Sequence, residues 1–302
     1  MAGRSVVGPT ALRMVLGSHL RALRERAGVS RTDAGWAIRA SESKISRLEL
    51  GRVGFKERDV ADLLSLYGVS EARERDRLLE LAREANNPGW WQRYGDVTPE
   101  WFDAYLGLEA TAELIRTYEI QFVPGLLQTA AYARAVAQLD PSSTSSTSRS
   151  PTQAVSTRSE GDIERVVALR TRRQRVLDRE PPLRLWAVIE ESVLHRPIGG
   201  TKVLRDQLVA LRDAVARPNV TIQIVPLENT GHAASGGAFS LFRFPQRDLP
   251  DIVYVEHLTS ALYLDKRDDV ETYTQALELV ASTSPPPART AHTLTRLLER
   301  LA

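Results

Sequence analysis

The 302-residue chain contains no cysteine. Without thiols it can form neither disulfides nor thiolate metal sites, and it has no cysteine nucleophile. No apolar run approaches the roughly 18 residues of a membrane-spanning helix, and the first residues hold no continuous apolar segment before a cleavage site. These absences favour a soluble globular protein of the cytoplasm. A length of 302 residues with 42% hydrophobic content predicts two domains.

Patterns of catalytic and metal-binding residues are also absent. The five histidines show no metal-ligand spacing, and the adjacent Glu190 and Glu191 would point to opposite faces of a strand. The glycine pairs at 199–200 and 236–237 lack the lysine and the flanking strand and helix of a phosphate loop. We therefore predict no catalytic residues, no cofactor and no metal, and an enzyme is the weakest of the hypotheses that we consider.

Positive charge is concentrated at the N-terminus. Residues 1–58 carry 12 Lys or Arg and 5 Asp or Glu, a net charge of +7, whereas the whole chain has +2, which leaves −5 for the rest. A basic segment of this kind is what binding to a polyanion such as DNA requires.

The pattern of residues 30–52 is that of two short helices joined by a tight turn. Ser30 is a good N-cap and Asp33 can be its capping-box partner, which predicts a first helix through Ile38. Gly35 lies inside this helix, where glycine costs roughly 1 kcal/mol against alanine unless a neighbouring helix comes very close. Two helices joined by so short a turn cross near this point, which accounts for the glycine.

The second helix of the pair is predicted to follow a turn at Arg39 and Ala40. Ser41 can cap it, and Ile45 and Leu48 share its apolar face. Four other side chains then face outward, where they can enter a DNA major groove: Glu42, Ser43, Ser46 and Arg47.

Three further helices complete a predicted all-helical domain. Leucines at helical spacing predict a first helix that ends at Gly28, and two helices follow the turn motif, the second capped by Ser70. An Asn-Pro-Gly sequence then breaks the pattern. We place the boundary there, with a DNA-binding domain over residues 1–87 and a second domain over residues 88–302.

The second domain is predicted to be α+β with a mixed sheet. Thr98 and Pro99 are predicted to begin a helix that reaches Ile115, and a second helix starts from Thr129. Residues 141–158 are rich in Ser and Thr and predict a loop. Helices are then predicted over 163–177, 203–215, 269–281 and 293–301, and strands over 183–189, 220–225, 238–244 and 252–256. Arginines within 170–175 are interpreted as a solvated helix face rather than a second DNA contact.

Residues 43–52, Ser-Lys-Ile-Ser-Arg-Leu-Glu-Leu-Gly-Arg, resemble the recognition-helix signature of the Xre/lambda-repressor family of helix-turn-helix domains. The resemblance implies base contacts from the outward row and phosphate contacts from its neighbours. Arg47 can donate two hydrogen bonds to guanine, and Glu42 can accept one from N4 of cytosine. The predicted DNA-binding residues are Arg31, Thr32, Ser41, Glu42, Ser43, Lys44, Ser46, Arg47 and Arg52.

Three positions depart from that family pattern or serve another role. Arg39 stands where the family usually has the turn glycine, and Ala34 stands where it usually has leucine, beside the bulky Trp36. These departures bear on the packing of the helices. Glu49, although it lies in the signature, is predicted to cap or brace the fold rather than to touch DNA.

The second domain resembles the C-terminal domain of WhiJ-like, antitoxin-like actinobacterial regulators. This resemblance implies a transcriptional regulator, often encoded beside a small BldB-like protein, whose second domain receives a partner or a signal. The segments that carry it are 118–129 (Tyr-Glu-Ile-Gln-Phe-Val-Pro-Gly-Leu-Leu-Gln-Thr), 173–175, 193–200, 217–220 and 262–264.

Two functions therefore compete. The first is a homodimeric, sequence-specific regulator that binds double-stranded DNA and whose second domain senses or dimerises. The alternative is an antitoxin-like interaction protein that captures a small BldB-like partner and binds DNA for autoregulation. The predicted partner-binding residues require exposed apolar side chains: Phe122, Pro124, Leu126 and Leu127.

Overall fold

The computed structural model describes residues 9–99, 101–139, 158–229, 236–245 and 249–301. The chain divides into two compact units, which are described separately. The first comprises Met1–Gln92 with Ala104–Thr111 and Gln246–Leu249, and the second Arg93–Asp103, Ala112–Pro245 and Pro250–Ala302. The predicted fold class is confirmed, because an all-helical region is followed by an α+β domain with a mixed sheet.

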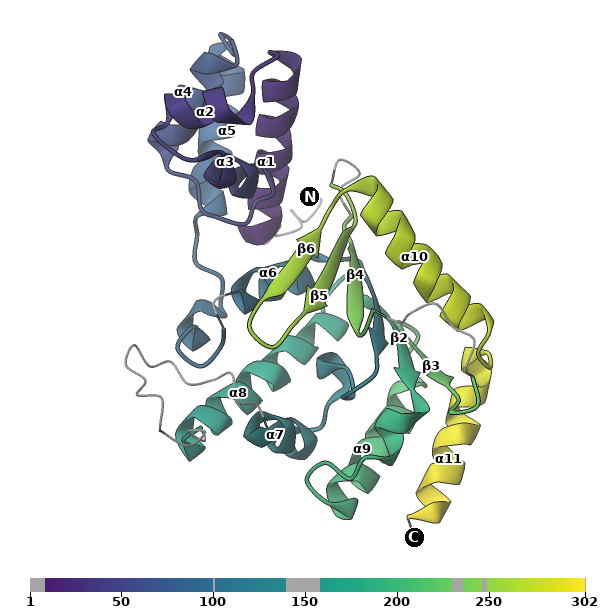
Figure 1. The fold of residues 1–302 in the computed structure, drawn as a ribbon. Helices are drawn as coiled ribbons and strands as arrows, with labels where there is room; N and C mark the ends of the chain where they lie inside the picture. The colour runs from purple at the N-terminus through teal and green to yellow at the C-terminus, as the bar shows by residue number, and fades with distance from the viewer. Residues whose placement is uncertain (1–8, 100, 140–157, 230–235, 246–248, 302) are drawn as a thin grey trace, which may run out of the picture. The chain divides into compact units, whose positions relative to one another are not determined.

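Five helices form the N-terminal region (Figure 1). They are α1 (Pro9–Arg26), α2 (Arg31–Ala37), α3 (Glu42–Glu49), α4 (Glu57–Leu66) and α5 (Ala72–Ala85). Every helix contributes to one hydrophobic core, in which Leu20, Ala34, Ile45, Leu64 and Ala82 are buried. The core follows from apolar side chains at helical spacing, which place one stripe of each helix on the inside.

The first four helices end in the same way. After each one a residue with a positive φ lets the next N–H bond back to a carbonyl five residues earlier, as in a Schellman motif. Glycine takes the positive-φ position after α1, α3 and α4, but Arg39 takes it after α2, with φ 53°. There the Ala40 N–H donates to the Gly35 carbonyl at 2.8 Å. The turn of the motif is therefore built on a left-handed arginine.

Two details of the predicted helices are wrong. A side chain at Gly35 would lie 2.6 Å from the Ala40 carbonyl oxygen, so the close approach is made by the turn after α2 and not by a neighbouring helix. The N-cap of α5 is Glu71, without a side-chain capping bond, instead of Ser70. Stabilisation of α5 thus comes from packing of its buried face rather than from its cap.

The second unit is built on a six-stranded mixed sheet with the strand order β3-β2-β1-β4-β5-β6 (Figure 1). The strands are β1 (Leu114–Glu119), β2 (Arg184–Glu190), β3 (Val220–Val225), β4 (Phe239–Arg243), β5 (Ile252–Glu256) and β6 (Ala261–Leu264). β1, β2 and β3 are parallel, whereas β4 pairs antiparallel with β1 and continues through β5 to β6. β1 therefore joins the parallel and antiparallel halves.

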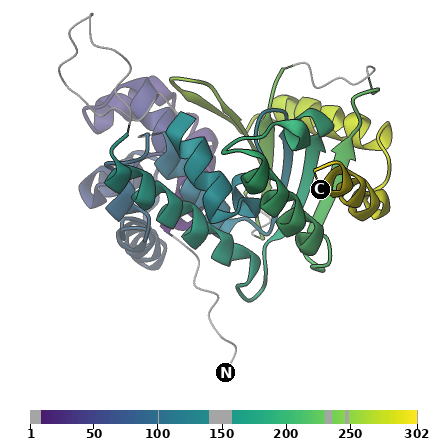
Figure 2. The same cartoon turned by 90° about the horizontal axis from the view of Figure 1, so that it is seen from below.

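Helices cover both faces of this sheet (Figures 1 and 2). The helices of the second unit are α7 (Ala130–Leu139), α8 (Glu160–Arg173), α9 (Thr201–Ala214), α10 (Arg267–Ser282) and α11 (Thr290–Arg300), whereas most of α6 (Phe102–Thr111) belongs to the first unit. Short 3-10 turns are η1 (Gln92–Tyr94), η2 (Gly125–Leu127), η4 (Gln174–Leu177), η5 (Glu191–His195) and η6 (Pro287–Arg289). α10 packs on one face through Leu277 and Val280, while α7, α8 and α9 lie on the other, and α11 packs along α9 beside β3.

The structure corrects the prediction around β1. The helix predicted from Thr98 begins only at Phe102, and the Thr98 hydroxyl donates to the Tyr94 carbonyl instead of capping. Ile115 lies in β1. This strand has a buried polar residue, Thr117, whose Oγ1 lies 2.9 Å from Ser240 Oγ on β4. Because a polar residue is buried in this strand and bonded to a distant partner, the hydrophobic pattern of the sequence does not indicate the strand.

Two further regions bear on the predictions. The short strand β6 was not predicted, since its residues are only partly covered at the sheet edge. The loop predicted at 141–158 lies, except for Arg158, outside the described residues. Among the helices described, none combines the length and apolar character that crossing a bilayer requires.

The left-handed Arg39 generates a stability prediction. Arg39→Gly removes the steric cost of a positive φ and should stabilise the chain by about 1 kcal/mol. Arg39→Ala is the matched control, because it removes the same side chain but keeps a Cβ, and it should bring no such gain. Urea unfolding followed by circular dichroism at 222 nm measures both. An equal gain in the two variants would assign the effect to the lost side chain instead of the backbone.

Candidate nucleic-acid interface

α3 is capped and amphipathic. The Ser41 Oγ accepts a hydrogen bond from the Lys44 N–H at 3.2 Å, which satisfies one of the free donors at the start of the helix. Ile45 and Leu48 are buried in the core. The opposite side of the helix faces solvent, with Arg47 exposed. α3 thus presents a polar surface on a helix that is anchored from behind.

The N-terminus of α2 is also capped. The Ser30 Oγ accepts from the Asp33 N–H at 3.1 Å, as predicted. The same hydroxyl donates to Asp33 Oδ2 at 2.6 Å, so the carboxylate reaches back to the hydroxyl and not to the backbone N–H of a capping box. Both helices of the motif therefore begin at defined residues.

Glu49 links three helices through its carboxylate. Its Oε1 accepts from Arg24 Nε of α1, and its Oε2 accepts from Arg24 Nη2 at 3.2 Å and from Arg31 Nε of α2 at 3.1 Å. The Glu49 side chain is only 3% exposed. Arg24 also donates to the Val29 carbonyl at 3.0 Å. The prediction that Glu49 braces the fold is confirmed.

The electrostatics of this site reflect the buried carboxylate. The hydrogen bond from Glu49 raises the pKa of the Arg24 guanidinium above its ordinary value, against the opposing effect of burial. Burial, together with the charge of Glu49, raises the pKa of the nearby Tyr67 to about 12. The Arg24 guanidinium therefore stays charged and Tyr67 stays neutral at physiological pH.

The predicted DNA-binding residues differ in exposure. Exposed are Thr32, Ser41, Glu42, Ser43 and Arg47, and partly buried are Arg31, Lys44, Ser46 and Arg52. The Lys44 ammonium lies 2.8 Å from Asp59 Oδ2 on α4, so this cation already has a partner. Arg31 uses Nε for Glu49, and its side chain is 37% exposed. The predicted DNA-binding residues thus fall into an exposed group and a partly buried group, and Lys44 and Arg31 of the second group already have partners within the protein.

The packing around Ala34, which replaces the leucine of the family pattern, is simple. Ala34 is fully buried and takes the core position on α2. Trp36 is 79% exposed and points away from that core. The bulky residue therefore does not replace the missing leucine.

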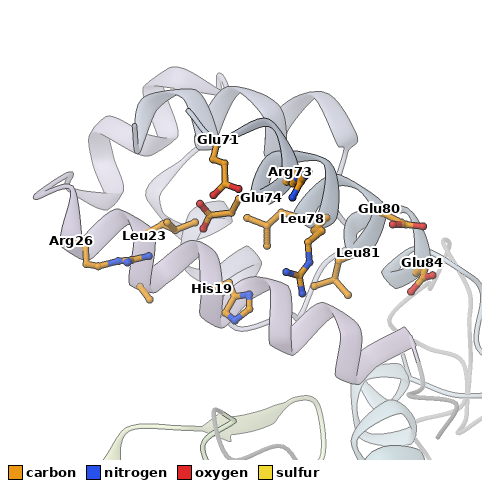
Figure 3. Close-up of a pocket in the computed structure, with 12 residues that line it drawn as sticks. His19, Leu23, Arg26, Glu71, Arg73, Glu74, Leu78, Glu80, Leu81 and Glu84 are labelled. Atoms are coloured by element: carbon orange, nitrogen blue, oxygen red, sulfur yellow. The ribbon is translucent and has the colours of Figure 1, made fainter. Parts of the chain in front are cut away.

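A groove of about 910 Å³ lies between α1 and α5 in the same unit (Figure 3). Leu23, Leu78 and Leu81 contribute apolar surface to it. Its charged lining comprises four glutamates and three arginines, namely Glu71, Glu74, Glu80, Glu84, Arg26, Arg73 and Arg77. Because acidic side chains outnumber the arginines, this groove is a poor cradle for phosphates.

The predicted partner-binding segment does not meet its condition. Leu126 and Leu127 are 5% and 8% exposed, and Pro124 is buried as well, while Phe122 is partly covered. These side chains pack inside the second unit because η2 lies against α8 and α9. They leave no continuous apolar surface for a partner.

The arginines of α8 and η4 are not a uniform solvated face. Arg173 is 5% exposed and its guanidinium lies 5.1 Å from the centre of the Phe102 ring. Arg170 donates to the Gln128 side chain at 3.0 Å. Burial of Arg173 contradicts the predicted solvated face at that position, and both arginines serve the packing of this unit.

In the second unit, Glu119 at the end of β1 and Glu190 at the end of β2 both interact with neighbouring side chains. Burial raises the pKa of Glu119 to about 7, although a hydrogen bond from the Thr117 hydroxyl opposes the shift. Glu190 accepts from the Tyr118 hydroxyl at 2.5 Å, and burial raises the pKa of this tyrosine. Both carboxylates are thus engaged with neighbours on the sheet.

Comparison with known families assigns both parts of the chain. Residues 15–78 match the family described as Helix-turn-helix domain. Residues 102–296, more than half of the chain, match the family described as Domain of unknown function (DUF5753). The chain belongs to the DUF5753 family. No curated protein and no solved structure matches it. The helix-turn-helix domain of this DUF5753 protein indicates a DNA-binding regulator.

Sequence reasoning missed two residues that position the interface. Arg24 follows Leu20 by four residues and so continues the apolar stripe of α1, which was the available signal for a buried cation. Asp59, the partner of Lys44, offers no such signal, because 15 residues separate the pair.

The brace around Glu49 generates a second prediction. Glu49→Gln removes the buried charge that Arg24 and Arg31 share and leaves the Arg24 guanidinium only the exposed Glu25 as an ion-pair partner, and breaking a buried pair in this way destabilises by about 3–5 kcal/mol. We expect the midpoint of the urea unfolding transition of the N-terminal region to shift to a lower urea concentration. Glu57→Gln is the control, since it breaks an exposed ion pair with Arg83 and should change little. Equal transitions for the two variants would show that Glu49 is not a brace.

Proposed function

We propose that this DUF5753 protein is a sequence-specific DNA-binding transcriptional regulator of the Xre/lambda-repressor type. The observation that carries the proposal is the capped and braced α3, which presents Glu42, Ser43 and Arg47 to solvent. The segment around it carries a net charge of +7 over residues 1–58. A helix of this size and polarity suits a major groove, and the charge suits the phosphates beside it.

Within this proposal the residues have two roles. Arg47 and Glu42 read base edges, with Ser43 and Ser46 beside them on α3. The residues assigned to the phosphate backbone are Arg31, Thr32, Ser41, Lys44 and Arg52. The geometry of Arg31 supports its assignment to the phosphate backbone. Its Nε donates a hydrogen bond to Glu49, which orients the guanidinium group in the absence of DNA.

The domain organisation is part of the same proposal. Residues 1–87 form the DNA-binding domain and residues 88–302 a regulatory domain of the WhiJ-like type, which senses a signal or a small partner or dimerises. A homodimer would place two copies of α3 on the half-sites of an operator. DNA as the ligand places the protein in the cytoplasm. The antitoxin-like alternative, with capture of a small BldB-like protein, loses the support of 122–127 through the burial of Leu126 and Leu127.

Salt dependence tests the phosphate contacts. Binding to DNA from the protein's own promoter region should weaken with salt by a log-log slope of about −0.9 per phosphate neutralised. Lys44→Gln should make that slope shallower by about 0.9, because Lys44 exchanges Asp59 for a phosphate. Fluorescence anisotropy over a salt series measures both slopes. Absence of specific binding at every salt concentration would refute the proposed function.

Base reading by Arg47 is tested separately. Arg47→Ala should cost roughly 1–3 kcal/mol on the preferred site and relax the choice of one base pair. Arg73→Ala, which removes an exposed arginine of α5, is the matched control and should keep the preference. Competition binding with single-base variants of the selected site is the measurement. A uniform loss over all sequences would move Arg47 to the phosphate-contacting group.

A further inference from the structure

A pocket of about 410 Å³ lies in the second unit where β2 and β3 end. η5 and the residues after β3 form one side, and η6 with α11 forms the other. The volume falls in the range of small-molecule sites. Its size is therefore that of a ligand pocket.

One wall of this pocket is cationic. Arg289, Arg296 and Arg300 line it, spaced so that they follow one side of α11, and His292 lies among them. Within the described part of the chain, none of these three guanidinium groups forms an ion pair. The opposite side of α11 is held by the buried Leu294 and Leu297. The arginines are thus presented by a docked helix and keep their hydrogen-bond donors available.

The acidic residues of the pocket do not neutralise that wall. Glu191 accepts from the Leu227 N–H at 3.2 Å through Oε2, and its Oε1 lies 3.4 Å from His195 Nε2. The Glu191 side chain is 11% exposed, so its carboxylate interacts with the loop after β3 and with His195 rather than with the arginines. Glu228 is the other acid in the lining. A ligand would meet more positive than negative charge.

We propose that this pocket binds a small organic anion. Its phosphate or carboxylate is held by Arg289 and Arg296, with Arg300 at the open end, because guanidinium groups match both anions with paired hydrogen bonds. Its apolar part rests on Ile224 and Pro226. The proposal concerns the second unit alone and does not rest on DNA binding.

Titration of the full chain without DNA tests this proposal. Isothermal titration calorimetry at constant ionic strength compares phenyl phosphate, benzoate and inorganic phosphate. We expect saturable binding of phenyl phosphate or benzoate, and the tighter of the two identifies the anion. Inorganic phosphate should bind more weakly than phenyl phosphate, because it leaves the apolar floor uncovered.

Variants locate the site. The double variant Arg289→Gln, Arg296→Gln should weaken binding of the better probe by about tenfold or more, since both charge-assisted contacts are lost. The control is Arg205→Gln, Arg267→Gln, which removes two exposed arginines outside the pocket and should bind like the parent.

Three outcomes would overturn the assignment: no saturable binding of phenyl phosphate or benzoate, unchanged binding in the pocket variant, or equal weakening in the control. Circular dichroism melting of both variants shows whether the fold is kept. Because the titration contains no DNA, its failure would leave DNA recognition by α3 unaffected.

Discussion

The N-terminal region depends on one buried carboxylate. Glu49 is inaccessible to solvent and would be costly to bury alone, yet it receives donors from Arg24 of α1 and Arg31 of α2. The charges of Glu49, Arg24 and Arg31 neutralise one another only when α1, α2 and α3 hold their observed positions. Hydrophobic packing allows small shifts of a helix, whereas paired charges with short hydrogen bonds do not. The brace therefore selects one placement of α3 among the packings that its apolar face permits.

That constraint explains how a short helix can hold one position. α3 has only eight residues, and an isolated helix of this length is unstable in water. Its order comes from the Ser41 cap, from buried Ile45 and Leu48, and from Glu49 near its end. All of these lie on the inner side or at the ends. The outer side, with the exposed Arg47, is left to residues that need not stabilise the helix.

Much of the N-terminal region could be predicted from local sequence signals. Residues whose role depends on a partner far away in the sequence could not be predicted in this way. The caps Ser30 and Ser41 and the exposed face of α3 follow from spacing and side-chain chemistry within a few residues. The stripe of α1 indicates that Arg24 is buried but not that its partner is Glu49, which lies 25 residues away, and no local pattern indicates that Asp59 pairs with Lys44. The same limit explains the error at β1, where the buried Thr117 is satisfied by a residue of β4 that is 123 positions away. Roles of the DNA-binding residues were inferred from pattern and resemblance and stay predictions.

The second unit uses buried polar groups in a comparable way, at its β3 edge. The Gln223 side chain donates to the Ala281 carbonyl at 2.7 Å and to the Pro285 carbonyl at 2.9 Å, and the Thr290 hydroxyl donates to the Ile222 carbonyl at 2.6 Å. These bonds fix the chain where α10 ends and α11 begins. They therefore fix the cationic wall of the pocket relative to the end of β3. Three neighbouring arginines repel one another, and an anion between them would remove that repulsion and favour the docked position of α11. A ligand at this site would consequently act on the helix that packs beside both β3 and α9, which gives a small anion a physical route to change the stability of this domain.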